Sequence, residues 1–284
     1  MRVATGSLPL GLRRRHMLKG SRMLAATAVA LIFLFPVYWM FAVSLKPAEE
    51  IFHSPPLWYP HTPSLRHFWI LFKDGDVLSV WNSLITASIS TVITMFIGTI
   101  CAYSIVRFRT GGEGLANWFL SWRMLPPVAM VFPVFLIFAF LRWSDTYHGL
   151  IILYTAFNLP YVIWMMRGYI EDIPIELEES ALVDGCTRWQ VLYKVVLPMC
   201  RAGLFATAVF AFIFAWNEFI FAFILTRKDI VTFPVQVTHY FGPQFQHWGK
   251  ISAMAVLGTL PVFFVVASLQ KYLVRGISMG ALKG

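Results

Sequence analysis

A charged stretch from Glu171 to Pro198 carries most of the chemistry that this sequence offers. The chain is 58% hydrophobic, yet this stretch holds six of its fourteen acidic residues. They are Glu171, Asp172, Glu176, Glu178, Glu179 and Asp184. Carboxylates form strong hydrogen bonds with basic groups, and small residues such as Ser180 and Ala181 allow a partner's backbone to come close. We therefore predict a docking surface for a soluble partner.

Local signals within the stretch predict a short first helix. Asp172 and Pro174 favour a helix start, since an acid near the N-terminus and a proline in the first turn both suit that position. The helix is expected over 175–183. Asp184 and Gly185 then give a turn signal, because glycine adopts a positive φ without strain.

A second short helix is predicted after the turn. Thr187 followed by Gln190 fits a capping box at its start, and Pro198 is expected to end it. An amphipathic helix lying on the inner leaflet is the alternative, but such helices are usually rich in Lys and Arg rather than Glu.

The remainder of the chain has the composition of a polytopic membrane protein. Only 13% of its 284 residues are charged, and a spanning helix needs about 20 mostly apolar residues. The sequence predicts an all-α integral membrane protein with six spans. They lie near Met23–Leu45, Asn82–Val106, Leu115–Leu141, Gly149–Met166, Gly203–Leu225 and Ile251–Val274. The front of the first span is basic like a signal peptide, but the position of Ala28-Val29-Ala30 favours an uncleaved anchor.

The distribution of positive charge predicts the orientation. With the N-terminus inside, fifteen of the 23 Lys and Arg residues fall in cytoplasmic segments and seven in outer loops, which places both termini in the cytoplasm. The charged stretch then faces the cytoplasm. The net charge of +9 reflects this topology, since no basic stripe interleaved with aromatics indicates nucleic-acid binding.

This topology divides the chain into four parts. They are a basic tail (1–22), the first span with its outer loop (23–80), a five-helix transmembrane domain that includes the charged stretch 171–198 (81–274), and a C-terminal tail (275–284). The first outer loop holds five prolines and is expected to be extended and ordered, with Ser64 capping a short helix. The aromatic residues of both long outer loops suit either the membrane surface or contact with an external ligand or protein.

Catalytic and metal-binding patterns are not found. The seven histidines show no metal-ligand spacing, and no nucleotide-binding or hydrolase motif is present. Glu218 is the one carboxylate within a predicted span, so it is a candidate for the translocation path, together with Asn217 and Asn158. A structural role for Glu218 near a helix end is the alternative. Arg123 and Pro126-Pro127 are expected to shape a kink.

The order of the motifs resembles a known family. Glu179-Ser180-Ala181, followed by Asp184-Gly185 and Leu197-Pro198, resembles the EAA loop of permease subunits of binding-protein-dependent ABC importers. Ser180 replaces the second-position alanine, a small-for-small change. Four further matches resemble the carbohydrate-uptake, maltose-transporter-like members. They are Ser44-Leu45-Lys46-Pro47 with Glu50-Ile51, Arg123-Met124-Leu125-Pro126-Pro127 with Pro133, Trp216-Asn217-Glu218, and the C-terminal residues 276–284.

The resemblance implies a type I ABC importer permease fold in the bacterial inner membrane. It also implies a homologous second permease, two copies of an ATP-binding subunit, an extracytoplasmic solute-binding protein, and a sugar or sugar derivative as cargo. ATP hydrolysis would then occur on the partner subunits, so this chain is not expected to be an enzyme or to hold a cofactor. The ATPase-coupling residues implied are Glu179, Ser180, Ala181, Asp184, Gly185 and Pro198.

Two other functions are kept as alternatives. An ion-coupled secondary transporter would be expected to show repeats, broken helices and several ionisable residues at the membrane midplane, and only Glu218 meets that description. A membrane enzyme lacks a catalytic constellation. The sequence does not name the sugar.

Overall fold

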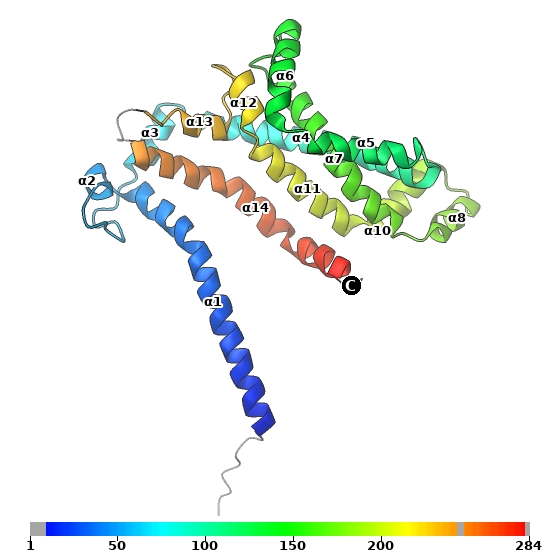
Figure 1. Cartoon of the computed structure of the whole chain (residues 1–284), viewed down its shortest axis with the longest axis horizontal. Helices are drawn as coiled ribbons and strands as arrows, with labels where there is room; N and C mark the ends of the chain where they lie inside the picture. Colours follow the sequence, from blue (N-terminus) through cyan, green and yellow to red (C-terminus); the bar gives the residue numbers. More distant parts are fainter. Residues whose placement is uncertain (1–9, 243–246, 282–284) are drawn as a thin grey trace, which may run out of the picture. The chain divides into compact units, whose positions relative to one another are not determined.

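The computed structural model describes residues 10–242 and 247–281, and this part of the chain is helical without any strand (Figure 1). The prediction of an all-α fold is confirmed. The helices are α1 (Leu10–Leu45), α2 (Ala48–Ile51), α3 (Arg66–Lys73), α4 (Leu78–Phe108), α5 (Gly112–Met124), α6 (Pro127–Leu141), α7 (Tyr147–Glu171), α8 (Ile175–Val183), α9 (Arg188–Val191), the π-helix η1 (Leu192–Val196), α10 (Leu197–Met199), α11 (Arg201–Trp216), α12 (Ile220–Leu225), α13 (Phe233–Thr238) and α14 (Trp248–Ala281).

Within the described residues, four helices are long and apolar enough to cross a membrane unbroken. They belong to α1, α4, α7 and α14, and they match four of the six predicted spans. The number of candidate spans rises to as many as six if each of two bent helix pairs is counted as one span. The pairs are Asn117–Met124 with Pro127–Leu141 and Arg188–Met199 with Arg201–Trp216. One bent pair, α5 with α6, forms the third predicted span, and the other bends at Cys200, just before the fifth.

The third predicted span breaks at two consecutive prolines. The axes of α5 and α6 meet at 95°. Leu125 and Pro126 are extended, and Pro127 begins α6. Neither proline has an N–H to continue a helix, and a residue that precedes a proline avoids the α conformation. The predicted kink is thus present, as a complete change of direction.

The fifth predicted span breaks at 217–219, between α11 and α12. The carboxylate of Glu218 accepts hydrogen bonds from the backbone N–H groups of Phe221 at 2.9 Å and Ala222 at 3.1 Å. A helix start leaves such N–H groups unpaired, so a carboxylate placed there stabilises a new helix. A length-and-hydropathy rule does not detect this break.

The chain divides into two compact units, residues 1–70 with 244–256 and residues 71–243 with 257–284. In the first unit, the proline-rich loop is folded back by two charged side chains. The Lys46 ammonium donates to the carbonyl of Leu57 and lies 4.5 Å from the centre of the Trp39 ring. Glu50 accepts hydrogen bonds from the backbone of His61 and Thr62, at 2.9 and 2.8 Å. The loop is ordered, as predicted.

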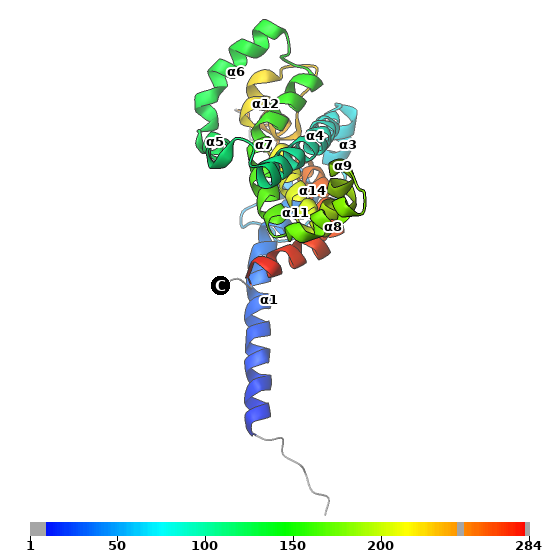
Figure 2. The ribbon, with the colours of Figure 1, turned by 90° about the vertical axis from the view of Figure 1, so that its right-hand side faces the viewer.

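In the second unit, α4, α7 and α11 pack side by side (Figures 1 and 2). Gly98 of α4 marks a close approach to α7, because a Cβ there would lie 2.6 Å from a methyl carbon of Val162. Small residues let membrane helices approach in this way. Buried serines and threonines line the same side of α4, at 79, 83, 86, 90, 91, 94 and 99.

Asp145, in the turn between α6 and α7, fixes a second segment of this unit. Its carboxylate accepts four backbone N–H bonds, at 3.0 to 3.1 Å, from residues 227–230. Partial burial raises the pKa of the Asp145 carboxyl, but the four donors outweigh burial, and the pKa lies below its ordinary value of 3.8.

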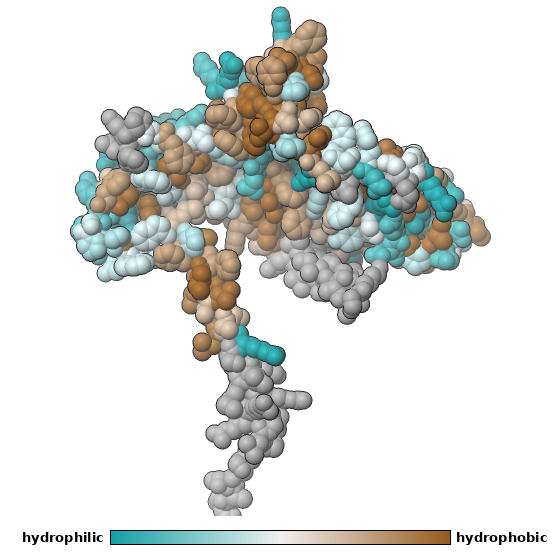
Figure 3. Space-filling view, viewed as in Figure 1, coloured by the Kyte–Doolittle hydropathy of each residue, from teal (hydrophilic) through white to brown (hydrophobic). Residues whose placement is uncertain are grey.

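Hydrophobic side chains are exposed over α6, whereas the end of the unit that carries α8 shows hydrophilic and hydrophobic side chains together (Figure 3). In the last outer loop, Gln244, Phe245 and Gln246 lie outside the described residues, whereas Phe241 and Trp248 are described and exposed. Tyr240 is described and is buried.

Candidate functional site

The first helix of the charged stretch has the predicted bounds. It is α8, Ile175–Val183, with Pro174 as its N-cap residue. Gly185 has a φ of 86°. Its N–H bonds to the carbonyl of Leu182, and the N–H of Cys186 bonds to that of Ala181, both at 3.0 Å. This pair of bonds is the Schellman motif, which ends a helix at a left-handed glycine.

The second helix begins as predicted and ends one residue beyond the predicted stop, and it contains a π-helical segment. Thr187 and Gln190 form both bonds of a capping box, at 3.3 and 2.7 Å. From α9 the helix continues through the π-helix η1 into α10, which ends at Met199, one residue beyond Pro198, and the chain then bends by 81° before α11. Leu197 donates five residues back, to Leu192. Because proline lacks an N–H and crowds the preceding turn, the wider π turn fits directly before it.

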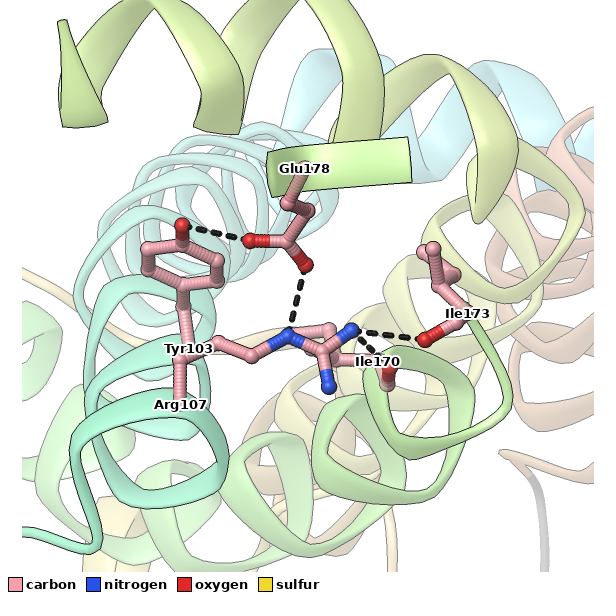
Figure 4. Close-up of polar contacts among 5 residues, drawn as sticks. All are labelled: Tyr103, Arg107, Ile170, Ile173 and Glu178. Atoms are coloured by element: carbon pink, nitrogen blue, oxygen red, sulfur yellow. Dashed lines mark hydrogen bonds and ion pairs between the residues drawn. The ribbon is translucent and has the colours of Figure 1, made fainter. Parts of the chain in front are cut away.

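Glu178 is buried against two residues of α4. Its carboxylate accepts a bond from Arg107 Nε at 2.6 Å and another from the hydroxyl of Tyr103 at 2.8 Å (Figure 4). The Glu178 side chain is only 1% exposed and that of Arg107 is 10% exposed. The prediction that Glu178 pairs with a basic group on a partner is therefore wrong, since its pairing is satisfied within the chain.

Of the residues predicted for ATPase coupling, Glu179, Ser180 and Ala181 lie on α8, and Asp184 and Gly185 lie in the turn that follows it. Glu179, Ser180, Asp184 and Gly185 are exposed and Ala181 is half-buried; Pro198, beyond η1, is exposed as well. Large apolar side chains accompany them. Val183 is 89% exposed and Trp189 is 63% exposed. The surface thus combines acidic, small and apolar groups, which is typical of a protein-docking site rather than of a merely solvated helix.

A cavity of about 670 Å³ brings together the three residues predicted for the translocation path. Asn158 is buried and its amide donates to the carbonyl of Ala211 at 3.4 Å. Asn217 donates to the carbonyl of Ile213 at 2.8 Å, and Glu218 caps α12 as described above.

Aromatic rings surround these polar groups. Trp118, Trp122, Phe157, Phe214 and Phe219 line the same cavity. The guanidinium of Arg123, also in the lining, lies 4.6 Å from the centre of the Phe214 ring. Flat apolar rings combined with a few hydrogen-bonding groups suit a ligand that has both an apolar face and hydroxyl groups.

Sequence reasoning missed Tyr103 and Arg107. Both are about 70 positions away from Glu178, and no local pattern links them. One signal was available: Arg107 is a basic residue at the end of a long apolar run, where its guanidinium can bond to backbone carbonyls at the end of a helix. Over the described residues, no group of three His, Cys, Asp or Glu side chains could hold a metal ion.

Comparison with known proteins matches the chain to a family and to two named permeases. Residues 94–279 match the family described as binding-protein-dependent transport system inner membrane component. The chain is 34% identical over 269 residues, 94% of each chain, to the sulfoquinovosyl glycerol transport system permease protein SmoH of Agrobacterium fabrum. It is 33% identical over 267 residues to the trehalose/maltose transport system permease protein MalG of Thermococcus litoralis, which covers 92% of this chain and 95% of that protein.

A solved structure shares the fold. It is a chain of a bacterial ABC transporter involved in the import of the acidic polysaccharide alginate, with a TM-score of 0.74 and 21% identity. The match covers 94% of this chain and 99% of the solved one.

Proposed function

The chain belongs to the family of binding-protein-dependent transport system inner membrane components, and we propose that it is a membrane-spanning permease subunit of an ATP-driven importer for a sugar or sugar derivative. Its relatives are named for sulfoquinovosyl glycerol and for trehalose and maltose, which supports a carbohydrate. Its working assembly contains a second permease, two ATP-binding subunits and a solute-binding protein, in the inner membrane of a bacterium.

The observation that carries this proposal is the two-sided character of α8. One side is fixed to α4 through Glu178, and the other exposes Glu179, Asp184 and Val183. A helix that docks a moving partner needs both properties. Its exposed side has to bind the partner, and its fixed side has to transmit the movement of the partner to α4. The partner in this proposal is the ATP-binding subunit, which offers basic groups to the acids and an apolar pocket to Val183 and Trp189.

The cavity beside Glu218 serves in this proposal as part of the sugar path. Its volume of about 670 Å³ lies within the usual range of small-molecule sites. The rings of Trp118, Trp122 and Phe219 stack on the apolar faces of the sugar, and Asn158 and Asn217 bond to its hydroxyl groups. Glu218 holds the helix break open through its bonds to the backbone.

Reconstitution tests the proposal. The chain is purified with its partner permease and the ATP-binding subunits and inserted into proteoliposomes, and uptake is measured for a panel that includes radiolabelled trehalose and maltose. We expect uptake to require both MgATP on the side of the ATP-binding subunits and the solute-binding protein on the other. Uptake that continues without ATP under a proton or sodium gradient would instead support the ion-coupled transporter.

A further inference from the structure

Three helical elements meet at the guanidinium of Arg107. The residue itself is on α4, and its Nε bonds to Glu178 of α8 at 2.6 Å. Its Nη2 donates to the carbonyls of Ile170, in the last turn of α7, and Ile173, in the linker to α8, at 2.9 and 2.8 Å (Figure 4). One side chain therefore joins α4, α7 and α8.

The position of this contact makes it difficult to deform. Arg107 and Glu178 are both almost excluded from solvent. If α8 slid relative to α4, it would leave two buried charges unpaired, which is strongly unfavourable. The planar guanidinium also fixes direction, because its donors point along set lines to the carboxylate and to the two carbonyls. Ala181 and Leu182 also pack against an apolar cluster that includes Tyr103, Ile170 and Val191, but apolar packing is less directional.

We propose that Arg107 is the positioning residue that makes α8 move as one body with the ends of α4 and α7, so that displacement of α8 by the ATP-binding subunit reaches the membrane-spanning helices. This inference rests on the proposed docking of α8. Without Arg107, α8 remains linked to α7 by the short linker 172–174 and by apolar contacts, and its displacement is absorbed there.

Matched arginine variants provide the test. Arg107→Gln removes the contact that joins α4, α7 and α8. Arg167→Gln is the control, because the Arg167–Glu171 pair has the same 2.6 Å Nε–Oε1 distance but is partly exposed to solvent and lies within one helix, α7. The double variant Arg107→Gln with Glu178→Gln keeps the test valid if the single variant folds poorly, since it leaves no lone buried carboxylate. Arg107→Lys keeps the positive charge but lacks the planar set of guanidinium N–H donors.

The readout is amide hydrogen exchange of the assembled transporter, with and without trapping by MgATP and vanadate. In the wild type, we expect trapping to change exchange rates in parallel at α8 and at the ends of α4 and α7, by about three-fold or more. In Arg107→Gln and in the double variant, the change at α8 persists and the changes at α4 and α7 fall to less than about half their wild-type size. Arg107→Lys should give an intermediate result and Arg167→Gln the wild-type pattern.

Other outcomes separate the possible failures. A purely structural role for Arg107 predicts faster exchange at all three ends, equally with and without nucleotide, and that result overturns the inference. So does an Arg107→Gln transporter whose nucleotide response equals the wild type's. If α8 of the wild type does not respond to MgATP at all, the result refutes the proposed docking of α8 to the ATP-binding subunit. It does not refute the proposed role of Arg107.

Discussion

Replacement of Gly185 separates backbone strain from partner docking. Gly185 has a φ of 86°, and a Cβ added there would meet no atom of this chain within 4 Å. Gly185→Ala therefore introduces no clash within the chain, and its intrinsic effect is the left-handed strain of an L-residue, about 1–2 kcal/mol. For a protein of this size, we expect a fall in melting temperature of about 2–8 °C.

The effect on transport should be larger if a partner packs against the exposed turn. A Cβ at this position would then occupy space that the partner needs, and we expect Gly185→Ala to lower ATP-driven uptake by more than about ten-fold, that is, by more than about 1.4 kcal/mol of coupling. Gly185→Asp, which also adds a charge, should be at least as severe. Thermal unfolding in detergent and uptake into proteoliposomes are measured on the same preparations.

Gly185→Asn decides between the two causes. Asparagine tolerates the left-handed conformation better than alanine does, so strain alone predicts that the Asn variant is closer to the wild type. Docking predicts the opposite order, because the Asn side chain is larger. If uptake by the Asn variant exceeds that by the Ala variant, or if the Asp variant transports normally, docking at Gly185 is refuted.

The remaining predictions concern two further carboxylates, those of Asp145 and Glu218. Asp145→Asn should destabilise the fold at pH 7 by about 1–2 kcal/mol, discounted for partial exposure to solvent, and speed amide exchange at 227–230. Because the folded pKa of Asp145 is lowered, this stabilisation is present above the unfolded value of about 3.9 and is lost as the pH falls through the folded pKa, so wild type and variant should converge there. Glu218→Gln leaves one acceptor where the carboxylate has two, so we expect a loss of about 1 kcal/mol in stability and no change in the KM for sugar. A KM raised by about ten-fold or more would show instead that Glu218 contacts the cargo.

Features set by neighbouring residues could be predicted from the sequence. The bounds of α8, the capping box at Thr187 and the positive φ of Gly185 each depend on side chains within four positions. The path of the backbone through the predicted spans could not be predicted in the same way. An apolar run long enough to cross a membrane has that length whether it is straight or broken, and the break at 217–219 depends on a carboxylate that bonds to the turn beyond it.

The glutamates of α8, Glu176, Glu178 and Glu179, show what further information the sequence held about which acid is paired within the chain. In a helix, residues three and four positions apart share a face, so Glu178 lies on the same face as Ala181 and Leu182, and both of these pack toward the core. A glutamate on the apolar face of an amphipathic helix has to be paired within the protein, because an unpaired buried carboxylate is too unfavourable to persist. Glu179, one position later, points about 100° away and is exposed. Helical phase favours an internal pair for Glu178, which shares its face with both Ala181 and Leu182, whereas Glu179 shares its face with Leu182 and the exposed Val183. The identity of the pairing residue, Arg107, depends on how α4 packs against α8 and requires the fold.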